Sequence, residues 1–150
     1  MNATIKHNGR YYNVNLNSSL DLSVSISPDG ILAWGAPKLI IEPFQERGWI
    51  GDVSEGSAVN FNNIIFNPHA HSTHTECVGH ISLQKESLNK ELEDFFLMSQ
   101  LITIFPKKKN NDCVITKKMI SDIFINNDKI DALIIRTMPN ESNKKNKDYS

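Results

Sequence analysis

The sequence predicts a mixed α/β fold from three observations. Stretches in the first part of the chain alternate polar and apolar residues, as half-buried strands do. Two later stretches carry apolar residues at helical spacing. Continuous apolar runs also occur, of the kind that forms buried strands. Because hairpin strands come first and strands then alternate with short helices, we expect a mixed sheet with helices packed on it.

An N-terminal hairpin is the first expected element. Residues 11–16 and residues 21–26 both alternate apolar and polar side chains, so each should be a strand with one buried face. Residues 17–19 provide a short polar turn that would join the two strands. The Ser-Pro-Asp-Gly sequence at residues 27–30 predicts the next turn, because proline fixes φ and glycine accepts a positive φ.

The middle of the chain is expected to hold two short strands separated by a loop. Residues 38–41 and residues 62–66 are the strands, and a proline stops each of them. Residues 45–58 contain three glycines and little periodicity, which predicts a loop. Since Pro68 ends the second strand, the segment at residues 67–80 begins where a strand leaves the sheet. Such exits often carry binding or catalytic groups on a rigid scaffold.

Two helices are expected in the second half of the chain. Ser87 is a suitable N-cap for a helix whose apolar residues recur at helical spacing as far as residue 96. Thr116 is the N-cap candidate of another helix, with an apolar face that reaches residue 124. The polar residues 126–128 should end this second helix.

Two apolar strands are expected beside these helices. Residues 101–105 are β-branched and aromatic and should form a buried strand. Residues 132–135 form a continuous apolar run, which predicts a central strand. The lysine-rich residues 107–112 should form a solvated loop, and residues 140–150 are polar without periodicity.

Composition narrows the class of protein. A chain of 150 residues is expected to form a single domain over residues 1–150. The formal net charge of -1 gives no reason to expect nucleic acid or an anionic membrane as a partner. The N-terminus lacks the apolar core of a secretory signal, and no apolar run reaches the ~20 residues that span a bilayer. With two cysteines in no framework spacing, we expect a cytoplasmic protein.

Residues 67–80 concentrate reactive side chains, with four of the five histidines of the chain. Imidazole and carboxylate groups are ligands that Zn²⁺ prefers. His74 and Glu76 are separated by one residue, so in an extended segment both point toward the same metal. His69 or His71 could supply a further imidazole, but not both, because they would lie on opposite faces. The alternative is a purely structural cluster.

Other reactive residues have plainer interpretations, apart from His80. Its imidazole is placed to transfer a proton in either direction near neutral pH. Cys77 is expected to be a small buried thiol rather than a zinc ligand. His7 is expected at the surface and Asp131 in a turn or cap. Trp49, like the other tryptophan, is more typical of a packing or loop anchor than of a substrate platform.

The histidine segment also carries a resemblance. Residues 73–80 resemble the signature His-x-Gly-Thr-His-x-Asp-Ala-Pro-x-His of the cyclase-like metal-dependent hydrolases, which include bacterial kynurenine formamidase and isatin hydrolase. Residues 20–23 are similar to the opening Asp-Leu-Ser of that family, and residues 34–37 to its aromatic turn. Residues 132–137 are similar to its Leu-Leu-Leu-Arg-Thr strand. The matches follow the family order from about residue 20 to residue 137.

The resemblance implies a swivelling β/β/α fold and hydrolysis of a small-molecule amide. The typical reaction is conversion of N-formylkynurenine to kynurenine in tryptophan catabolism, with a divalent metal, zinc first and manganese as the alternative. Family members are usually oligomers. By position, His74 resembles a metal ligand, Glu76 takes the place of the ligand Asp, and His80 takes the place of the catalytic histidine. On the aromatic turn, Trp34 is the candidate substrate-binding residue.

This chain departs from the family signature in three ways. Glu76 is longer by one methylene than the usual Asp. The family position of the first histidine is Ala70 here, flanked by His69 and His71, of which His69 is the preferred ligand; Ser72 also replaces a glycine. A further His and Glu expected toward the C-terminus have no match, so we expect the single domain to be incomplete at its C-terminus.

Three functional hypotheses follow. The first is a metal-dependent amide hydrolase. The second is a truncated or degenerate relative that keeps the fold and a metal without turnover. The third is an unrelated metal-binding or interaction domain, which would explain the histidines but not the ordered matches elsewhere in the chain.

Overall fold

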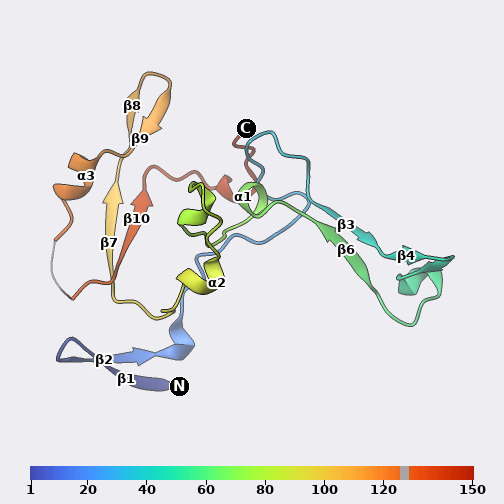
Figure 1. The fold of residues 1–150 in the computed structure, drawn as a ribbon, viewed down its shortest axis with the longest axis horizontal. Coiled ribbons are helices and arrows are strands. Elements are labelled where there is room, and N and C mark those ends of the chain that lie inside the picture. Colours follow the sequence, from blue (N-terminus) through green and yellow to red (C-terminus); the bar gives the residue numbers. More distant parts are fainter. Residues whose placement is uncertain (126–128) are drawn as a thin grey trace. The chain divides into compact units, whose positions relative to one another are not determined.

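The computed structural model describes residues 1–125 and 129–150 as a mixed α/β chain (Figure 1). The described residues form five two-stranded sheets and three short α-helices. The predicted α/β class is therefore confirmed. The swivelling β/β/α arrangement, which needs a larger sheet, stays a prediction. No helix within the described ranges has the length and apolar character to cross a bilayer.

The chain divides into two compact units, which are described separately below. Unit 1 comprises Met1–Asp21 and Glu76–Glu141, and unit 2 comprises Leu22–Thr75 and Ser142–Ser150. Each unit therefore contains segments that are distant in the sequence. Among the residues that the structure describes, four 3-10 turns connect the regular elements, at Leu16–Ser18, Val53–Glu55, Val78–His80 and Lys144–Asn146.

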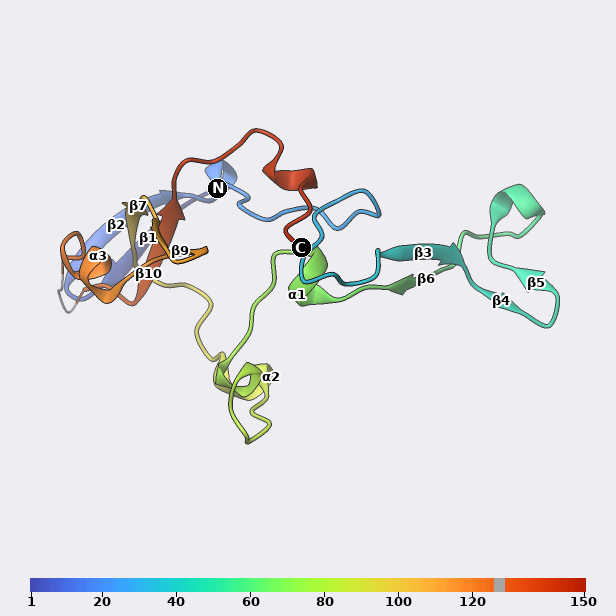
Figure 2. The ribbon, with the colours of Figure 1, turned by 90° about the horizontal axis from the view of Figure 1, so that it is seen from above.

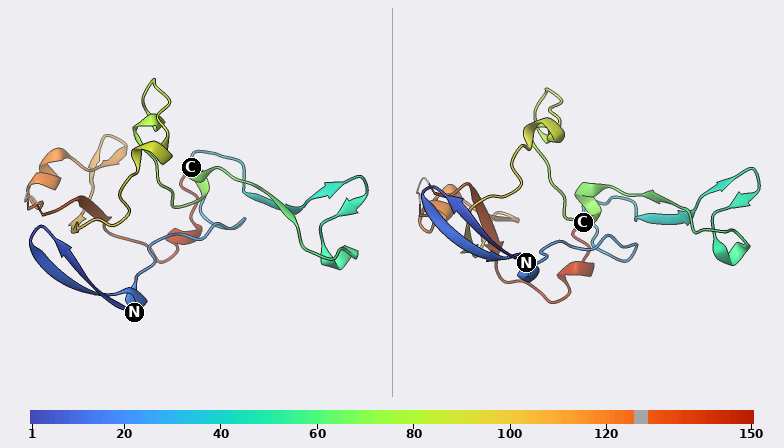
Figure 3. Two further views of the ribbon diagram at one scale, coloured as in Figure 1. Left: turned by 60° about the horizontal axis from the view of Figure 1, so that its bottom comes forward. Right: turned by 90° about the horizontal axis from the view of Figure 1, so that it is seen from below.

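An antiparallel hairpin begins unit 1 (Figure 3). Strand β1, Asn2–His7, pairs with β2, Arg10–Asn15. Asn8 and Gly9 form the turn, both with positive φ, at 44° and 75°. Asn-Gly is the strongest short hairpin signal, because both residues accept this conformation. The predicted partner at residues 21–26 is wrong, since those residues form no strand.

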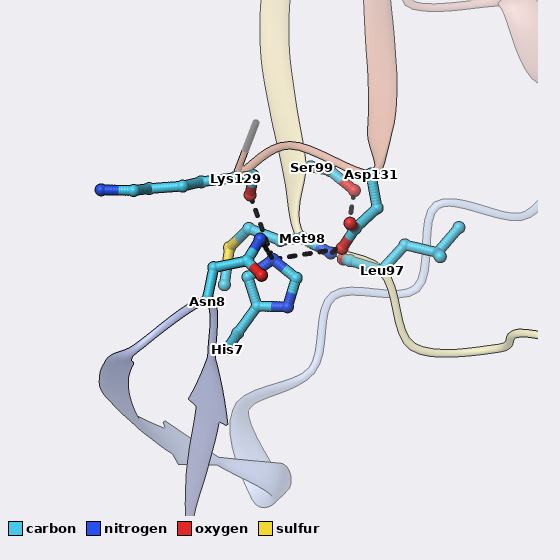
Figure 4. A network of polar contacts seen from close by, with 7 residues as sticks. All are labelled: His7, Asn8, Leu97, Met98, Ser99, Lys129 and Asp131. Atoms are coloured by element: carbon cyan, nitrogen blue, oxygen red, sulfur yellow. Dashed lines mark hydrogen bonds and ion pairs between the residues drawn. The ribbon is translucent and has the colours of Figure 1, made fainter. Parts of the chain in front are cut away.

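Polar contacts attach this hairpin to the rest of unit 1 (Figure 4). The Nε2 atom of His7 lies 3.2 Å from the carbonyl oxygen of Lys129 and 3.5 Å from Oδ2 of Asp131. Oδ2 of Asp131 also accepts a hydrogen bond from the backbone N–H of Met98, at 2.9 Å. Asp131 is thus a cap, as predicted. The expectation that His7 is a surface residue is wrong, because these contacts half-bury it.

The core of unit 1 lies on a parallel strand pair. Strand β7, Ser99–Ile104, runs beside β10, Ala132–Thr137 (Figure 1). Ile102 and Ile104 of β7 are buried whereas Leu101 is 56% exposed, so the predicted strand is confirmed but only one of its faces is buried. The prediction that β10 is central is wrong: within the described residues it pairs with β7 alone, and Ile134 is 42% exposed.

Two short helices belong to unit 1, and both are shorter than predicted. Helix α2 covers Leu88–Glu91 and α3 covers Lys117–Ser121. The start of α3 is as predicted, because the Thr116 hydroxyl accepts a hydrogen bond from its first turn. The predicted extension of α2 to residue 96 is wrong, and Phe96 is 92% exposed. Helices draw most of their stability from packing an apolar face, and here that face is not covered.

The lysine-rich segment forms a hairpin instead of the predicted loop. Strand β8, Lys107–Lys109, pairs with β9, Asp112–Val114. Asn110 adopts a φ of 56° in the turn, a conformation that asparagine tolerates better than most residues. Residues 126–128, predicted to end the second helix, lie outside the described residues.

Unit 2 is built on an antiparallel ribbon. Strand β3, Ile40–Pro43, pairs with β6, Asn62–Ile65, and Figure 2 shows them side by side. Both strands were predicted, within two residues at each end. The registered pairs join Ile40 to Ile65 and Ile41 to Ile64. All four isoleucines are exposed, so neither face of the ribbon is covered.

The predicted loop at residues 45–58 contains a second, smaller hairpin. Strand β4, Gln45–Glu46, pairs with β5, Trp49–Ile50, beyond the end of β3 (Figure 2). Arg47 and Gly48 turn the chain with positive φ values of 50° and 85°.

An aromatic cluster stabilises this tip. The rings of Phe44, Trp49 and Phe61 have centroids 5.3–6.2 Å apart and are tilted against one another. Tilted arrangements at this separation are favourable because of the ring quadrupoles. Trp49 is therefore a packing residue, as predicted.

Burial in β7 gives a testable expectation for stability. Ile104 is 2% exposed, so Ile104→Ala should lower the free energy of unfolding by about 2–5 kcal/mol through lost burial and a cavity. Ile134→Ala, at an exposed position of the paired strand, should cost about 1 kcal/mol or less. Urea unfolding followed by circular dichroism measures both. Equal losses would contradict the assignment of the core to β7.

Candidate metal centre

One helical turn carries the first histidines of the cluster. Strand β6 ends at Ile65 and helix α1 follows over Pro68–His71. The Asn67 side chain caps the helix by accepting a hydrogen bond from the His69 N–H, at 3.0 Å. The extended geometry expected for this stretch is therefore wrong up to His71. Two positions along a helix differ by about 200°, so the two helical histidines still face different ways.

His69 points toward His74. Its Nδ1 atom lies 3.1 Å from Nε2 of His74, and the two rings meet edge to face with centroids 4.7 Å apart. The other nitrogen of His74, Nδ1, lies 3.0 Å from the carbonyl oxygen of Ser72. Because a carbonyl only accepts, His74 carries a proton on Nδ1, and its Nε2 shares one further proton with Nδ1 of His69. A backbone carbonyl that fixes a tautomer in this way is common behind metal-binding histidines.

Glu76 completes a group of three donors. One ligand atom each of His69, His74 and Glu76 lies within 4.8 Å of the other two, and all three residues are exposed. The group lies within eight consecutive residues, so the local backbone brings the donors together. Of the upstream histidines considered from the sequence, the structure brings His69 to this group.

The donor set fits a divalent metal. Two imidazole nitrogens and one carboxylate oxygen are the protein ligands of many catalytic zinc sites, which keep a further position open. The proton shared by His69 and His74 must leave when a metal binds, because ligand nitrogens are unprotonated. Manganese accepts the same donor types.

His80 lies next to the group. It ends the 3-10 turn Val78–His80, and its Nδ1 is 3.6 Å from Oε2 of Glu76. Both side chains are about half exposed. The carboxylate therefore faces the imidazole. The catalytic role of His80 stays a prediction.

His71 is separated from the group. It is 4% exposed, and both of its ring nitrogens are occupied. Nδ1 accepts a hydrogen bond from the backbone N–H of Asn67 at 2.9 Å, and Nε2 lies 2.9 Å from the carbonyl oxygen of Pro37. The ring is therefore neutral, with its proton on Nε2. Of the two upstream candidates for a metal ligand, His71 is therefore the one that does not join the donor group.

The remaining candidates have simpler surroundings. Trp34 has a φ of 62° and is 83% exposed, so its ring packs on little of unit 2, against the expected packing role. Its substrate-binding role stays a prediction. The Cys77 thiol is half-buried and contacts the carbonyl oxygen of Glu86 at 3.6 Å, and it does not belong to the donor group.

Unit 2 contains a cavity of about 280 Å³ that the sequence did not predict. It is lined by the turn at residues 27–30, by Leu39 and His71, and by Asp148 from the C-terminal segment. Hydrogen bonds from Ser150 lower the pKa of the Asp148 carboxyl. The turn was expected from its sequence, but no local pattern indicates that the C-terminal segment folds back beside it.

The protein is thus a mixed α/β chain with a His-His-Glu group that could hold a metal. A family model described as "Putative cyclase" matches residues 20–150. The chain therefore belongs to this cyclase family, as the resemblance of residues 73–80 predicted. No curated protein and no solved structure matches the chain. The hairpin of β1 and β2 precedes the matched residues.

The donor group predicts metal binding that depends on His74. The wild type should bind Zn²⁺ with measurable affinity, and His74→Ala should weaken binding by more than about 100-fold, beyond the usual effect of losing a supporting residue. Competition with a chromophoric chelator measures this. His7→Ala, which removes an imidazole outside the group, is the matched control. Unchanged affinity in His74→Ala would exclude His74 as a ligand.

Proposed function

We propose that this chain is a metal-dependent hydrolase of an amide C–N bond, similar to arylformamidases. The observation that carries the proposal is the grouping of His69, His74 and Glu76 next to His80. Membership of the cyclase family supports it. The proposed substrate is N-formylkynurenine, which would yield kynurenine in tryptophan catabolism. The proposed location is the cytoplasm, and the free thiols of both cysteines are compatible with a reducing compartment.

The chemistry divides between the metal and the side chains. His69, His74 and Glu76 would hold the metal, zinc first and manganese as the alternative. When bound, such an ion polarises a carbonyl and lowers the pKa of water. Hydrolysis adds water oxygen to the formyl carbon, breaks the C–N bond and leaves formate and an amine.

His80 is proposed to give the departing nitrogen its proton. The Glu76 carboxylate lies 3.6 Å from Nδ1 of the ring and can hold the imidazole in place while it transfers the proton. After the C–N bond breaks, the neutral imidazole takes up a proton again from the water that enters the next cycle. Trp34, with its exposed ring, is the proposed contact for the aromatic part of the substrate.

A non-catalytic family member that keeps the metal is the second candidate function. Ala70 favours it, because it stands where the family has its first histidine and is 1% exposed. The side chain at position 70 is therefore a buried methyl group, which cannot serve as the metal ligand that the family has at this position. Glu76 in place of Asp also points this way, since its carboxylate reaches farther than the family geometry requires.

Activity of His80→Ala distinguishes the two functions. The wild type with Zn²⁺ or Mn²⁺ should hydrolyse N-formylkynurenine, and His80→Ala should lower kcat by about 100-fold or more at unchanged metal content, the usual range for losing a general acid. Absorbance of released kynurenine reports the rate, and His7→Ala is again the control. A wild type that binds metal without hydrolysis would select the non-catalytic function.

We also propose that the chain forms homo-oligomers. Each face of the ribbon of β3 and β6 carries one exposed pair of isoleucines in unit 2, and an isolated two-stranded ribbon is marginally stable in water. Covering these faces with a second copy would remove apolar area from water.

Charge on the ribbon should prevent this association. Ile41→Glu combined with Ile64→Glu places two carboxylates opposite each other on one face, and we expect a monomer in multi-angle light scattering where the wild type is larger. Asn62→Glu, on the same strand but opposite Pro43, should leave the oligomer intact. A wild-type monomer at micromolar concentration would refute the proposal.

A further inference from the structure

We propose that His71 is a positioning residue of the candidate metal centre: acting through Asn67, it fixes where His69 points. This proposal rests on the proposed function, because it assigns His69 to the metal. His71 itself touches neither the donor group nor, in our scheme, the substrate. Its part is to hold the helical turn on which a ligand stands.

Helix α1 needs such support because it is a single turn. A helix of four residues is far shorter than the ~12 residues at which isolated helices become marginally stable. Its internal bonds are few: the N–H groups of Ala70 and His71 donate to the carbonyl oxygen of Asn67, at 3.1 and 3.0 Å, and the Ser72 N–H and hydroxyl reach the carbonyl oxygen of Pro68, at 3.3 and 3.2 Å. Ala70 is the only apolar residue of the turn that is buried. Side-chain bonds must therefore define its orientation.

The buried ring of His71 supplies two of these bonds. Nδ1 accepts from the Asn67 N–H, and the Nε2 proton is donated to the carbonyl oxygen of Pro37, each at 2.9 Å. The ring thus links the start of α1 to a segment 34 residues earlier, close to β3. With a 4% exposed ring, water competes little for either bond.

Asn67 passes this constraint to His69. Its backbone N–H is held by His71, while its side-chain oxygen accepts from the His69 N–H at 3.0 Å. One residue therefore connects the buried imidazole to the backbone of the exposed one. The His69 ring then meets His74 at 3.1 Å. Loss of the His71 hydrogen bonds should therefore free the Asn67 backbone and, through it, the position of the His69 ring.

Two substitutions at position 71 test the relay. His71→Leu keeps an apolar side chain of similar size but removes both hydrogen bonds, whereas His71→Gln retains a donor and an acceptor. We expect His71→Leu to weaken Zn²⁺ binding by about 10–100-fold, the range seen for residues that support ligands, and His71→Gln to recover part of it. The visible spectrum of bound Co²⁺ should change in His71→Leu, because a ligand is displaced.

A double-mutant cycle separates positioning from general destabilisation. In a His69→Ala background, His71→Leu should have no further effect on Zn²⁺ affinity, because the ligand that it positions is already absent. An equal loss in both backgrounds, or wild-type affinity in His71→Leu, would overturn the proposal. Circular dichroism establishes that each variant is folded. If His71→Leu is unfolded, Asn67→Ala cuts the same relay at its middle and should show the same dependence on His69.

A metal-free measurement keeps this proposal distinct from the proposed function. Nuclear Overhauser contacts between the rings of His69 and His74 should be present in the wild type, lost in His71→Leu and retained in His71→Gln. If the wild type binds no metal but shows this pattern, the proposed function fails and the positioning role stands. If the ring contact persists in folded His71→Leu, the positioning role fails whatever the metal does.

Discussion

A single helical turn cannot hold its own shape in water, and the candidate metal centre stands on such a turn. Hydrogen bonds stabilise this turn in place of the additional turns that a longer helix would have. The Asn67 side chain caps the start of α1, and the buried ring of His71 connects it to Pro37. Each bond uses a backbone group that would otherwise be unsatisfied. The geometry of the donors therefore depends on a few specific hydrogen bonds, and much less on the breadth of the apolar core.

The small core of unit 2 also helps to fix the orientation of α1. Its buried apolar residues are Leu39, which precedes β3, and Ala70, which lies on α1. The helix that carries His69 is thus also the part of the unit that is best shielded from water. Burial of a methyl group on one side and exposure of an imidazole on the other give the turn a defined outer face. The donors can then meet a metal from solvent without disturbing the buried side.

The sequence predicted the chemistry of the site better than its local shape. The types of donor and their order are visible in residues 69–80, and the strand that precedes them ends as expected at a proline. What local patterns could not provide was the contact of His71 with Pro37, because it joins distant segments. The first hairpin differs from the prediction for another reason: the Asn8-Gly9 turn joins β1 to β2, whereas the alternation of residues 21–26 resembles a strand without forming one.

The ribbon of β8 and β9 and the ribbon of β3 and β6 differ in how readily a strand from another chain could pair with their edges. Strand β8 consists of three lysines, and pairing another chain along it would force ammonium groups together or out of water. Strands β3 and β6 carry four isoleucines instead, and their one charged residue is Glu42. Charge is thus dense along β8 and sparse along the isoleucine ribbon. Crowded or unfolding conditions should therefore direct aggregation to the isoleucine ribbon, and a solubility screen of this protein is best begun there.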